Sequence, residues 1–206
     1  MGVNCKMLKT NSKKNIIKII LIIVLIIFFI ILKNICELWL VKKERGFVYG
    51  KKNASIVIEE YSSFECGSCK DFHLENKDVL KKYITTGVVK YILKPVDIER
   101  FEYDDYIYTH LSNKEIKKLD YINRIFETQY EWINFENVEQ LNEFLKLESE
   151  KNKYFNDDFI WKKEELLDKK ISIVPHIKLN GEILDSKITR DELTKKIELI
   201  IKQKEN

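Results

Sequence analysis

Glycine, proline, alanine and cysteine are all scarce in this chain of 206 residues. There are 6 Gly, 2 Pro, 4 Cys and a single alanine, Ala54. So few Gly and Pro exclude collagen-like, mucin-like and other low-complexity chains, and four cysteines are too few for a small domain held together by disulfides. Excess charge of one sign is also lacking. The 36 basic and 33 acidic residues give a net charge of +3, so charge alone predicts no nucleic-acid binding.

The remaining composition is that of a folded protein. Hydrophobic residues make up 45% and charged residues 33% of the chain, a balance typical of globular rather than disordered proteins. At this length, one domain of ordinary size is expected. Neither a phosphate-binding glycine loop nor a Ser-His-Asp arrangement is recognisable. The functional signals therefore lie in an apolar run near the start and in a pair of cysteines.

The apolar run predicts a membrane anchor. Fourteen apolar residues follow one another from Ile19 to Leu32, after a segment rich in lysine. Fourteen helical residues span about 21 Å, short of the roughly 30 Å of a bilayer core. The helix lengthens at its start if Lys18 snorkels towards the headgroups, and Trp39 is placed like an interfacial aromatic residue. We expect a short basic tail over residues 1–15, and a transmembrane anchor with its interfacial segment over 16–41.

Other interpretations of this run stay open. A cleaved signal peptide would need small residues at an A-x-A-like site, and none follows the run; a buried core helix is the third reading. Cys36 could bridge two copies, stay reduced or carry a lipid, although Lys33 to Ile35 before it do not resemble a lipidation site. Basic residues flank both ends of the run, so charge counting does not decide its orientation.

Beyond the anchor, the hydrophobic pattern alternates between strands and helices. A polar tether at 42–52, with a candidate edge strand at 47–49, leads into the first β-prone run. The predicted order is then a strand at 56–61, a helix from about Cys66, a strand at 88–93, a helical insert at about 104–169, strand segments at 171–174 and 177–179, a hairpin turn at Asn180-Gly181 and a closing helix at 189–202. This order is α/β with a helical insert, in one domain over 53–206.

The sequence Cys66-Gly67-Ser68-Cys69 carries the chemistry. At the start of a helix, unpaired backbone N–H groups and the helix dipole favour an anion, so the pKa of the first thiol is expected below about 8.5. Cys66 is then the candidate nucleophile. Cys69, one turn deeper, is the candidate resolving thiol that closes the disulfide.

Two alternatives to a redox pair stay open on these residues alone. His73 completes a C-x2-C-x3-H spacing that supplies three ligands for zinc or copper, although no other Cys or His stands at the spacing of a fourth ligand. The other alternative is a pair of buried thiols that only pack.

The segment from Glu60 to His73, EYSSFECGSCKDFH, resembles the strand and active site of the DsbA-like branch of the thioredoxin superfamily. The resemblance runs from about Gly50 to Ile200. Val174-Pro175 resembles the family's cis-proline loop, and the apolar run with Asn180-Gly181 resembles the hairpin after it. The helical insert is what separates this branch from plain thioredoxin. The resemblance implies a thioredoxin-like fold with an inserted helical domain and the activity of a thiol–disulfide oxidoreductase.

The family's roles carry over to the matching positions as expectations. Cys66 becomes the exposed sulfur that attacks and is attacked, and Cys69 becomes its buried partner. Pro175, if cis, turns the chain beside the disulfide, and the backbone at Val174 pairs with a bound substrate strand.

Three further side chains have roles that are less tightly specified. Glu60, six residues before the first cysteine, is expected beneath the pair, where it relays the proton of Cys69; Glu59 is the alternative, and a plain surface charge is the third reading. His73 is either an ordinary residue of the family's active-site helix or a residue with a modest electrostatic effect on the cysteines. His176 either touches substrate at the rim of the site or is an ordinary strand residue.

The dipeptide between the cysteines departs from the family pattern. Strongly oxidising members commonly carry Pro-His there, whereas this chain has Gly67 and Ser68. Without a neighbouring imidazolium the Cys66 thiolate is stabilised less, so we expect a milder potential than that of the strongest oxidants. Gly67 and Ser68 are also candidate substrate contacts, together with Val174 and His176.

These inferences predict a membrane-anchored oxidoreductase that forms or exchanges disulfides in exported proteins. The expected substrates are reduced or unfolded exported proteins, and the only cofactor is the enzyme's own disulfide. The resemblance also implies a membrane redox partner for reoxidation. The expected location is the bacterial inner membrane, with a single span and the catalytic domain on the extracytoplasmic side, because the cytosol is reducing. The alternatives are a tethered reductase or isomerase, a metal-handling module using Cys66, Cys69 and His73, and an inactive interaction domain.

Overall fold

The computed structural model describes residues 15–33, 46–96, 98, 101–152 and 165–205. The chain divides into two compact units, Met1–Glu44 and Arg45–Asn206. In the first unit, Asn15–Lys33 forms one helix of 19 residues with mean hydropathy 3.3, long and apolar enough to cross a membrane, a property that signal sequences share. The predicted interfacial segment with Trp39, Cys36 and nearly all of the basic tail lie outside the described residues.

The second unit is built on a five-stranded mixed sheet in the order β1-β3-β2-β4-β5. The strands are β1 (Phe47–Tyr49), β2 (Ile56–Ser62), β3 (Val89–Pro95), β4 (His176–Leu179) and β5 (Glu182–Leu184). The central strand β2 runs parallel to β3 and antiparallel to β4, and both outer strands pair antiparallel with their neighbours. The strand that leads to the cysteines is therefore supported on both sides.

One face of this sheet is covered by the helix that carries the cysteines. Side chains alternate along β2, so Ile56, Ile58 and Glu60 share a face, and all three are completely buried. Helix α2 (Gly67–Thr85) packs on this face, as its contact with Glu60 shows, and α8 (Arg190–Glu205) packs against α2. The predicted strand–helix–strand unit and the closing helix are thus confirmed.

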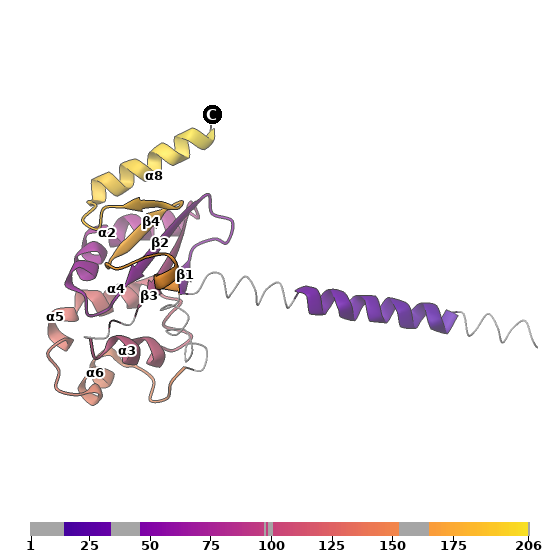
Figure 1. Cartoon of the computed structure of the whole chain (residues 1–206), viewed down its shortest axis with the longest axis horizontal. Helices are drawn as coiled ribbons and strands as arrows, with labels where there is room; N and C mark the ends of the chain where they lie inside the picture. Colours follow the sequence, from indigo (N-terminus) through magenta and orange to yellow (C-terminus); the bar gives the residue numbers. More distant parts are fainter. Residues whose placement is uncertain (1–14, 34–45, 97, 99–100, 153–164, 206) are drawn as a thin grey trace, which may run out of the picture. The chain divides into compact units, whose positions relative to one another are not determined.

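The predicted helical insert follows β3, and four of its helices lie within residues 101–152. These are α3 (Asp104–His110), α4 (Leu119–Glu127), α5 (Gln129–Trp132) and α6 (Val138–Leu145); α3, α5 and α6 gather beside one end of the sheet, away from α8 (Figure 1). Phe47 of β1 stacks on Tyr108 of α3 with ring centroids 5.2 Å apart, and Trp132 is fully buried. The insert therefore shares one core with the sheet. Of the helix predicted at 157–169, only residues 165–168 are described as helical.

One prediction about the sheet was wrong, and the hairpin prediction is confirmed. Residues 171–174 were predicted as strand, but β4 begins only at His176, because Pro175 has no N–H to donate to a neighbouring strand. The hairpin is confirmed, with positive φ at Asn180 (49°) and Gly181 (88°), as a tight two-residue turn requires. Strand β1 lies in the predicted tether and pairs with β3, so the folded unit already includes residues 47–49.

Candidate active site

The two cysteines lie where β2 leads into α2. Cys66 is the N-cap residue of α2, with extended backbone at φ −80° and ψ 120°, so it stands beside the unpaired N–H groups of the first turn. Cys66 is partly exposed, whereas Cys69 is completely buried, and both are free thiols in this structure. An attacking and a resolving thiol require this difference in exposure.

The loop before β4 lies against the exposed cysteine. The Val174–Pro175 peptide bond is cis. The Cys66 thiol donates a hydrogen bond to the carbonyl oxygen of Val174, with 3.7 Å between sulfur and oxygen. A loop about a hundred residues further along the chain is therefore brought to the first cysteine, as the resemblance predicts.

Glu60, rather than Glu59, lies on the side of the sheet that carries the cysteine helix. Its side chain is completely buried, its Oε2 accepts a hydrogen bond from the Tyr91 hydroxyl, and Oε2 lies 3.3 Å from Nε2 of His73. Its other oxygen, Oε1, has no hydrogen-bond partner within the described part of the chain. Glu59 points to the opposite face, where it forms an ion pair with Lys94 at 3.4 Å.

The environment of Cys69 strongly favours the protonated thiol. Burial raises the pKa of Cys69 far above its usual value, and the hydrogen bond with Cys66 and the negative charge of Glu60 act in the same direction. Cys69 can therefore become a nucleophile only if a nearby base removes its proton. Glu60, whose negative charge acts on this thiol, is a candidate for that base.

The loop just before Cys66 is held by the helical insert. Asp104, at the start of α3, accepts hydrogen bonds from the Ser63 hydroxyl at 2.6 Å and the Phe64 N–H at 2.7 Å. In return, Oε2 of Glu65 accepts two backbone N–H groups at the start of α3, and the Gln129 amide donates to the Phe64 carbonyl at 2.6 Å. Burial raises the pKa of Asp104 to about 7, against the lowering effect of the Ser63 hydroxyl. The insert thus positions the approach to the first cysteine.

His73 does not face the cysteines as a metal ligand would. Its Nδ1 lies 3.2 Å from Oδ1 of Asn123, its Nε2 faces Glu60 and Tyr91, and its ring stacks on Phe126 with centroids 3.9 Å apart. Across the described ranges, no group of three His, Cys, Asp or Glu side chains could hold a metal ion. The geometry therefore gives the metal-binding alternative no support.

Of the other predicted substrate contacts, Gly67 and Ser68 lie on the helix that carries the cysteines, whereas His176 lies on β4. Gly67 and Ser68 are exposed in the first turn of α2, and a Cβ added at Gly67 would meet no atom within 4 Å. His176 pairs with Tyr61 across the strands, on the face opposite to Glu60, with ring centroids 6.0 Å apart. A contact between His176 and substrate stays a prediction.

A buried ion-pair cluster holds the far face of the sheet. Lys94 is 1% exposed, and its Nζ lies 2.8 Å from Glu165 and 3.4 Å from Glu59. The Tyr61 hydroxyl also donates to Glu165, at 2.7 Å. Burial opposes ionisation of Glu165, but hydrogen bonds from Lys169 and Lys94 lower its pKa to about 2. This cluster fastens the segment before the cis-proline loop to the sheet.

Four polar residues at the site were missed by the sequence analysis: Tyr91, Asp104, Asn123 and Gln129. Each is buried and each reaches the active-site segment from a strand or helix distant in the chain. No local pattern connects them to the cysteines. Only a set of polar residues at otherwise apolar positions could have indicated them.

Comparisons with known proteins agree with this geometry. A family model described as Thioredoxin matches residues 42–199, most of the chain. Comparison with curated proteins gives no match. Among solved structures, a protein of unknown function from Enterococcus faecalis V583 is 24% identical, with a TM-score of 0.65 over 75% of this chain and 90% of that one.

Two further structures carry informative names. DsbA from Chlamydia trachomatis is 15% identical, with a TM-score of 0.57 over 78% of this chain and 92% of that chain. MdbA, a thiol-disulfide oxidoreductase from Actinomyces oris, is 18% identical, with a TM-score of 0.57 over 75% and 85%. At these identities the likeness shows the fold. The chain therefore belongs to the thioredoxin family and has the fold of its DsbA-like thiol–disulfide oxidoreductases.

Proposed function

We propose that the protein is a membrane-anchored thiol–disulfide oxidoreductase that forms or exchanges disulfides in exported proteins through Cys66 and Cys69. The observation that carries this proposal is the pairing of a partly exposed Cys66, 3.7 Å from the Val174 carbonyl, with a completely buried Cys69. The exposed sulfur can meet a substrate thiol, and the backbone beside it can pair with an extended substrate segment.

Oxidation of a substrate takes two exchange steps. A substrate thiolate attacks Sγ of Cys66 in the oxidised enzyme, the Cys66–Cys69 bond breaks, and the sulfur of Cys69 leaves and takes up a proton. A second thiolate of the same substrate then attacks the substrate sulfur of the mixed disulfide, and Cys66 leaves as the thiolate. The substrate gains one disulfide, and the enzyme gains two electrons as a dithiol. A membrane redox partner must then accept these electrons.

Buried Glu60 is the group we assign to the proton of Cys69. Because the environment of Cys69 holds its thiol protonated, formation of the Cys69 thiolate needs a base, and its departure as a leaving group needs an acid. Oε1 of Glu60, which has no hydrogen-bond partner among the residues that the structure describes, suits both tasks. The same two groups serve in either direction of electron flow.

The proposed location follows from the apolar helix and from redox chemistry. Asn15–Lys33 has the length and hydropathy of a single membrane span. A disulfide donor works only outside the reducing cytosol. We therefore assign the cysteines to the extracytoplasmic side of the inner membrane, with the amino-terminal tail in the cytoplasm.

Trapping of mixed disulfides tests the proposed activity. In full-length protein in detergent micelles, with Cys5 and Cys36 replaced by serine, Cys69→Ser should accumulate a covalent complex with an unfolded substrate protein that carries a disulfide. The Cys66 thiolate attacks that disulfide, one substrate sulfur leaves as a thiolate, and the resolving thiol is absent. Cys66→Ser is the matched control and should give no complex. The proposal fails if Cys69→Ser forms no complex, or if both variants form equal amounts.

The reduction potential decides the direction of electron flow. Equilibration of the full-length protein with glutathione buffers should give a value between about −120 and −180 mV, the range of oxidants and isomerases. A value near about −270 mV, like that of thioredoxin, would make the protein a tethered reductase.

A further inference from the structure

A row of buried, connected polar side chains leads from the active site to the groove between α2 and α4. The row begins at Glu60 of β2, which contacts His73 of α2, and His73 in turn contacts Asn123 of α4. Tyr91 of β3 donates a hydrogen bond to Glu60. Glu60 and His73 are at most 1% exposed, and Asn123 is 5% exposed. Polar groups buried this deeply need partners, so the hydrogen-bond donors and acceptors can be assigned.

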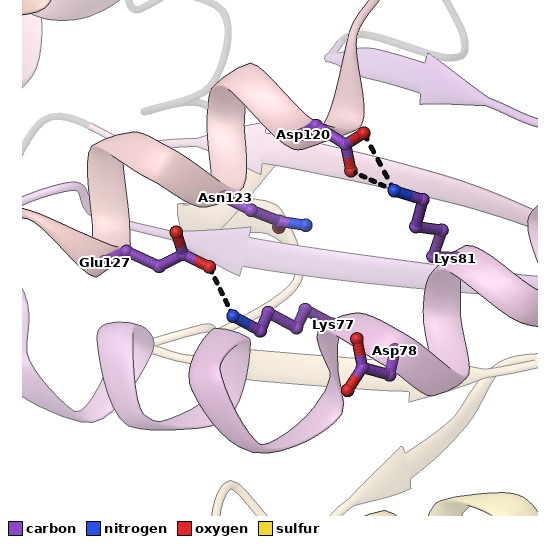
Figure 2. A pocket seen from close by; sticks show the side chains of 6 residues that line it. All are labelled: Lys77, Asp78, Lys81, Asp120, Asn123 and Glu127. Atoms are coloured by element: carbon purple, nitrogen blue, oxygen red, sulfur yellow. Dashed lines mark hydrogen bonds and ion pairs between the residues drawn. The ribbon is translucent and has the colours of Figure 1, made fainter.

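Asn123 fixes which nitrogen of His73 carries hydrogen. Its Oδ1 lies 3.2 Å from Nδ1 of His73, and its amide nitrogen points into the groove, as Figure 2 shows. An amide oxygen only accepts hydrogen bonds, so Nδ1 of His73 is the donor. Nε2 is then the nitrogen that can gain or lose a proton, and it faces Oε2 of Glu60 at 3.3 Å.

One proton must lie between Nε2 and Oε2. Two lone pairs facing each other in a buried site would be strongly unfavourable, so the pair is either imidazolium with carboxylate or imidazole with carboxylic acid. The Tyr91 hydroxyl donates to the same Oε2 and favours the carboxylate. Oε1, which has no partner in the described residues, remains available.

Within the part of the chain that the structure describes, no other cation contacts this pair. Tyr91 faces it from β3 and Cys69 from α2, while Asn123 and Phe126 face it from α4 and carry no charge. The lysines of β3, at positions 90 and 94, point to the opposite face of the sheet by strand alternation. The charge of Glu60 is therefore compensated by His73 alone among the contacts described.

We propose that His73 is a positioning residue that keeps Glu60 ionised by holding the shared proton on Nε2, so that Oε1 can accept the proton of Cys69. This inference rests on the proposed thiol–disulfide activity. When Cys69 attacks a mixed disulfide on Cys66, its proton moves to Oε1, the Cys66–Cys69 bond forms, and the substrate leaves as a thiolate. The pair then holds two protons and returns one to solvent. In the opposite direction, Oε1 gives the proton to the departing Cys69 sulfur.

The groove exposes the Asn123 end of these connected polar side chains to solvent. It is lined by Asn123 and by five charged residues, Lys77, Asp78, Lys81, Asp120 and Glu127 (Figure 2). Lys77 pairs with Glu127, and Lys81 pairs with Asp120 at 2.9 Å.

The test measures the pH dependence of the step in which Cys69 resolves a mixed disulfide. Reduced full-length protein, with Cys5 and Cys36 replaced by serine, is mixed in detergent with 5,5′-dithiobis(2-nitrobenzoate). Attack by Cys66 releases one coloured thiol and leaves a mixed disulfide, and the second coloured thiol, released when Cys69 attacks, is followed from pH 5 to pH 9. The variant is His73→Gln, whose amide cannot hold the shared proton as a cation. The proton then returns to Glu60, so release should be slower by about tenfold at pH 6 and should approach the wild-type rate at pH 9.

The controls separate this role from packing. His110→Gln makes the same change at another buried histidine, which bonds to the Tyr106 carbonyl at 2.8 Å in α3, and should leave the pH profile unchanged. Glu60→Gln should slow release at every pH. The inference is overturned if His73→Gln has the wild-type profile, or is slowed equally at all pH values. Failure of the wild-type protein to release the thiol would instead refute the proposed activity.

A measurement on the wild-type protein covers the case in which His73→Gln does not fold. Nitrogen NMR of the imidazoles should show hydrogen on Nδ1 of His73 in both redox forms, and a change at Nε2 when the Cys66–Cys69 disulfide is reduced. A His73 spectrum that is identical in the two redox forms from pH 5 to pH 8, or a neutral ring protonated at Nε2, would overturn the inference.

Discussion

Asp104 makes the stability of the active-site segment depend on pH. It is 1% exposed, and burial raises its pKa from 3.8 to about 7. A carboxyl group whose pKa is higher in the folded state holds its proton more tightly there. Its contribution to stability is therefore complete below the unfolded pKa and is lost as pH rises through about 7. Linkage between these pKa values gives a loss of about 2–3 kcal/mol in the free energy of unfolding between pH 5 and pH 8.

Asp104→Asn should remove this pH dependence. Asparagine has the same shape, its oxygen can accept the Phe64 N–H, and its amide can donate to the Ser63 hydroxyl, but it holds no titrating proton. Relative to the wild type, the variant should gain about 2–3 kcal/mol between pH 5 and pH 8, or about 5–10 °C in Tm.

Thermal unfolding of the full-length protein in detergent, followed by circular dichroism, measures this difference. Asp105→Asn is the matched control, because Asp105 is the next residue on α3, is 49% exposed and pairs with Lys151 at 3.4 Å. It should leave the pH dependence unchanged. If Tm of the wild type and of Asp104→Asn changes in parallel from pH 5 to pH 8, the reasoning is refuted.

Three other predictions test the site and the fold. Ser68→His should raise the reduction potential, because an imidazolium stabilises the Cys66 thiolate; each tenfold stabilisation is worth about 30 mV in glutathione equilibration, and an unchanged potential would contradict this. Lys94→Met should lower the free energy of unfolding by about 3 kcal/mol, since it removes the lysine that pairs with Glu59 and one of the two lysines that pair with Glu165; a loss in thermal unfolding below about 1 kcal/mol would argue against it. Gly50→Ala should lower the free energy of unfolding more than Gly181→Ala does. For Gly181→Ala the expected loss is about 1 kcal/mol. Both glycines have positive φ, but only at Gly50 would the new Cβ meet a backbone oxygen, at 2.3 Å, so equal shifts in Tm would refute this reasoning.

The sequence alone predicts the parts of the fold that local patterns control. The β-prone runs at 56–61 and 88–93, the helix from Cys66 and the Asn180-Gly181 turn depend on neighbouring residues, and all four are present. The prediction of strand at 171–174 was wrong. The β-branched residues there favour a strand, but a proline at the next position cannot donate to the sheet, and the carbonyl of Val174 bonds to Cys66 instead.

The candidate site divides in the same way. The cysteine spacing and the carboxylate six residues earlier are local features, so the sequence by itself predicts the arrangement of the site: two thiols at a helix start, with an acid on the preceding strand. Which acid lies beneath the thiols depends on the register of β2, and the structure places Glu60 there and Glu59 on the opposite face. Only the tertiary structure brings Asp104, Asn123 and Tyr91 to the site. Their contacts join side chains distant in the chain, and burial decides which polar groups must pair and which thiol keeps its proton.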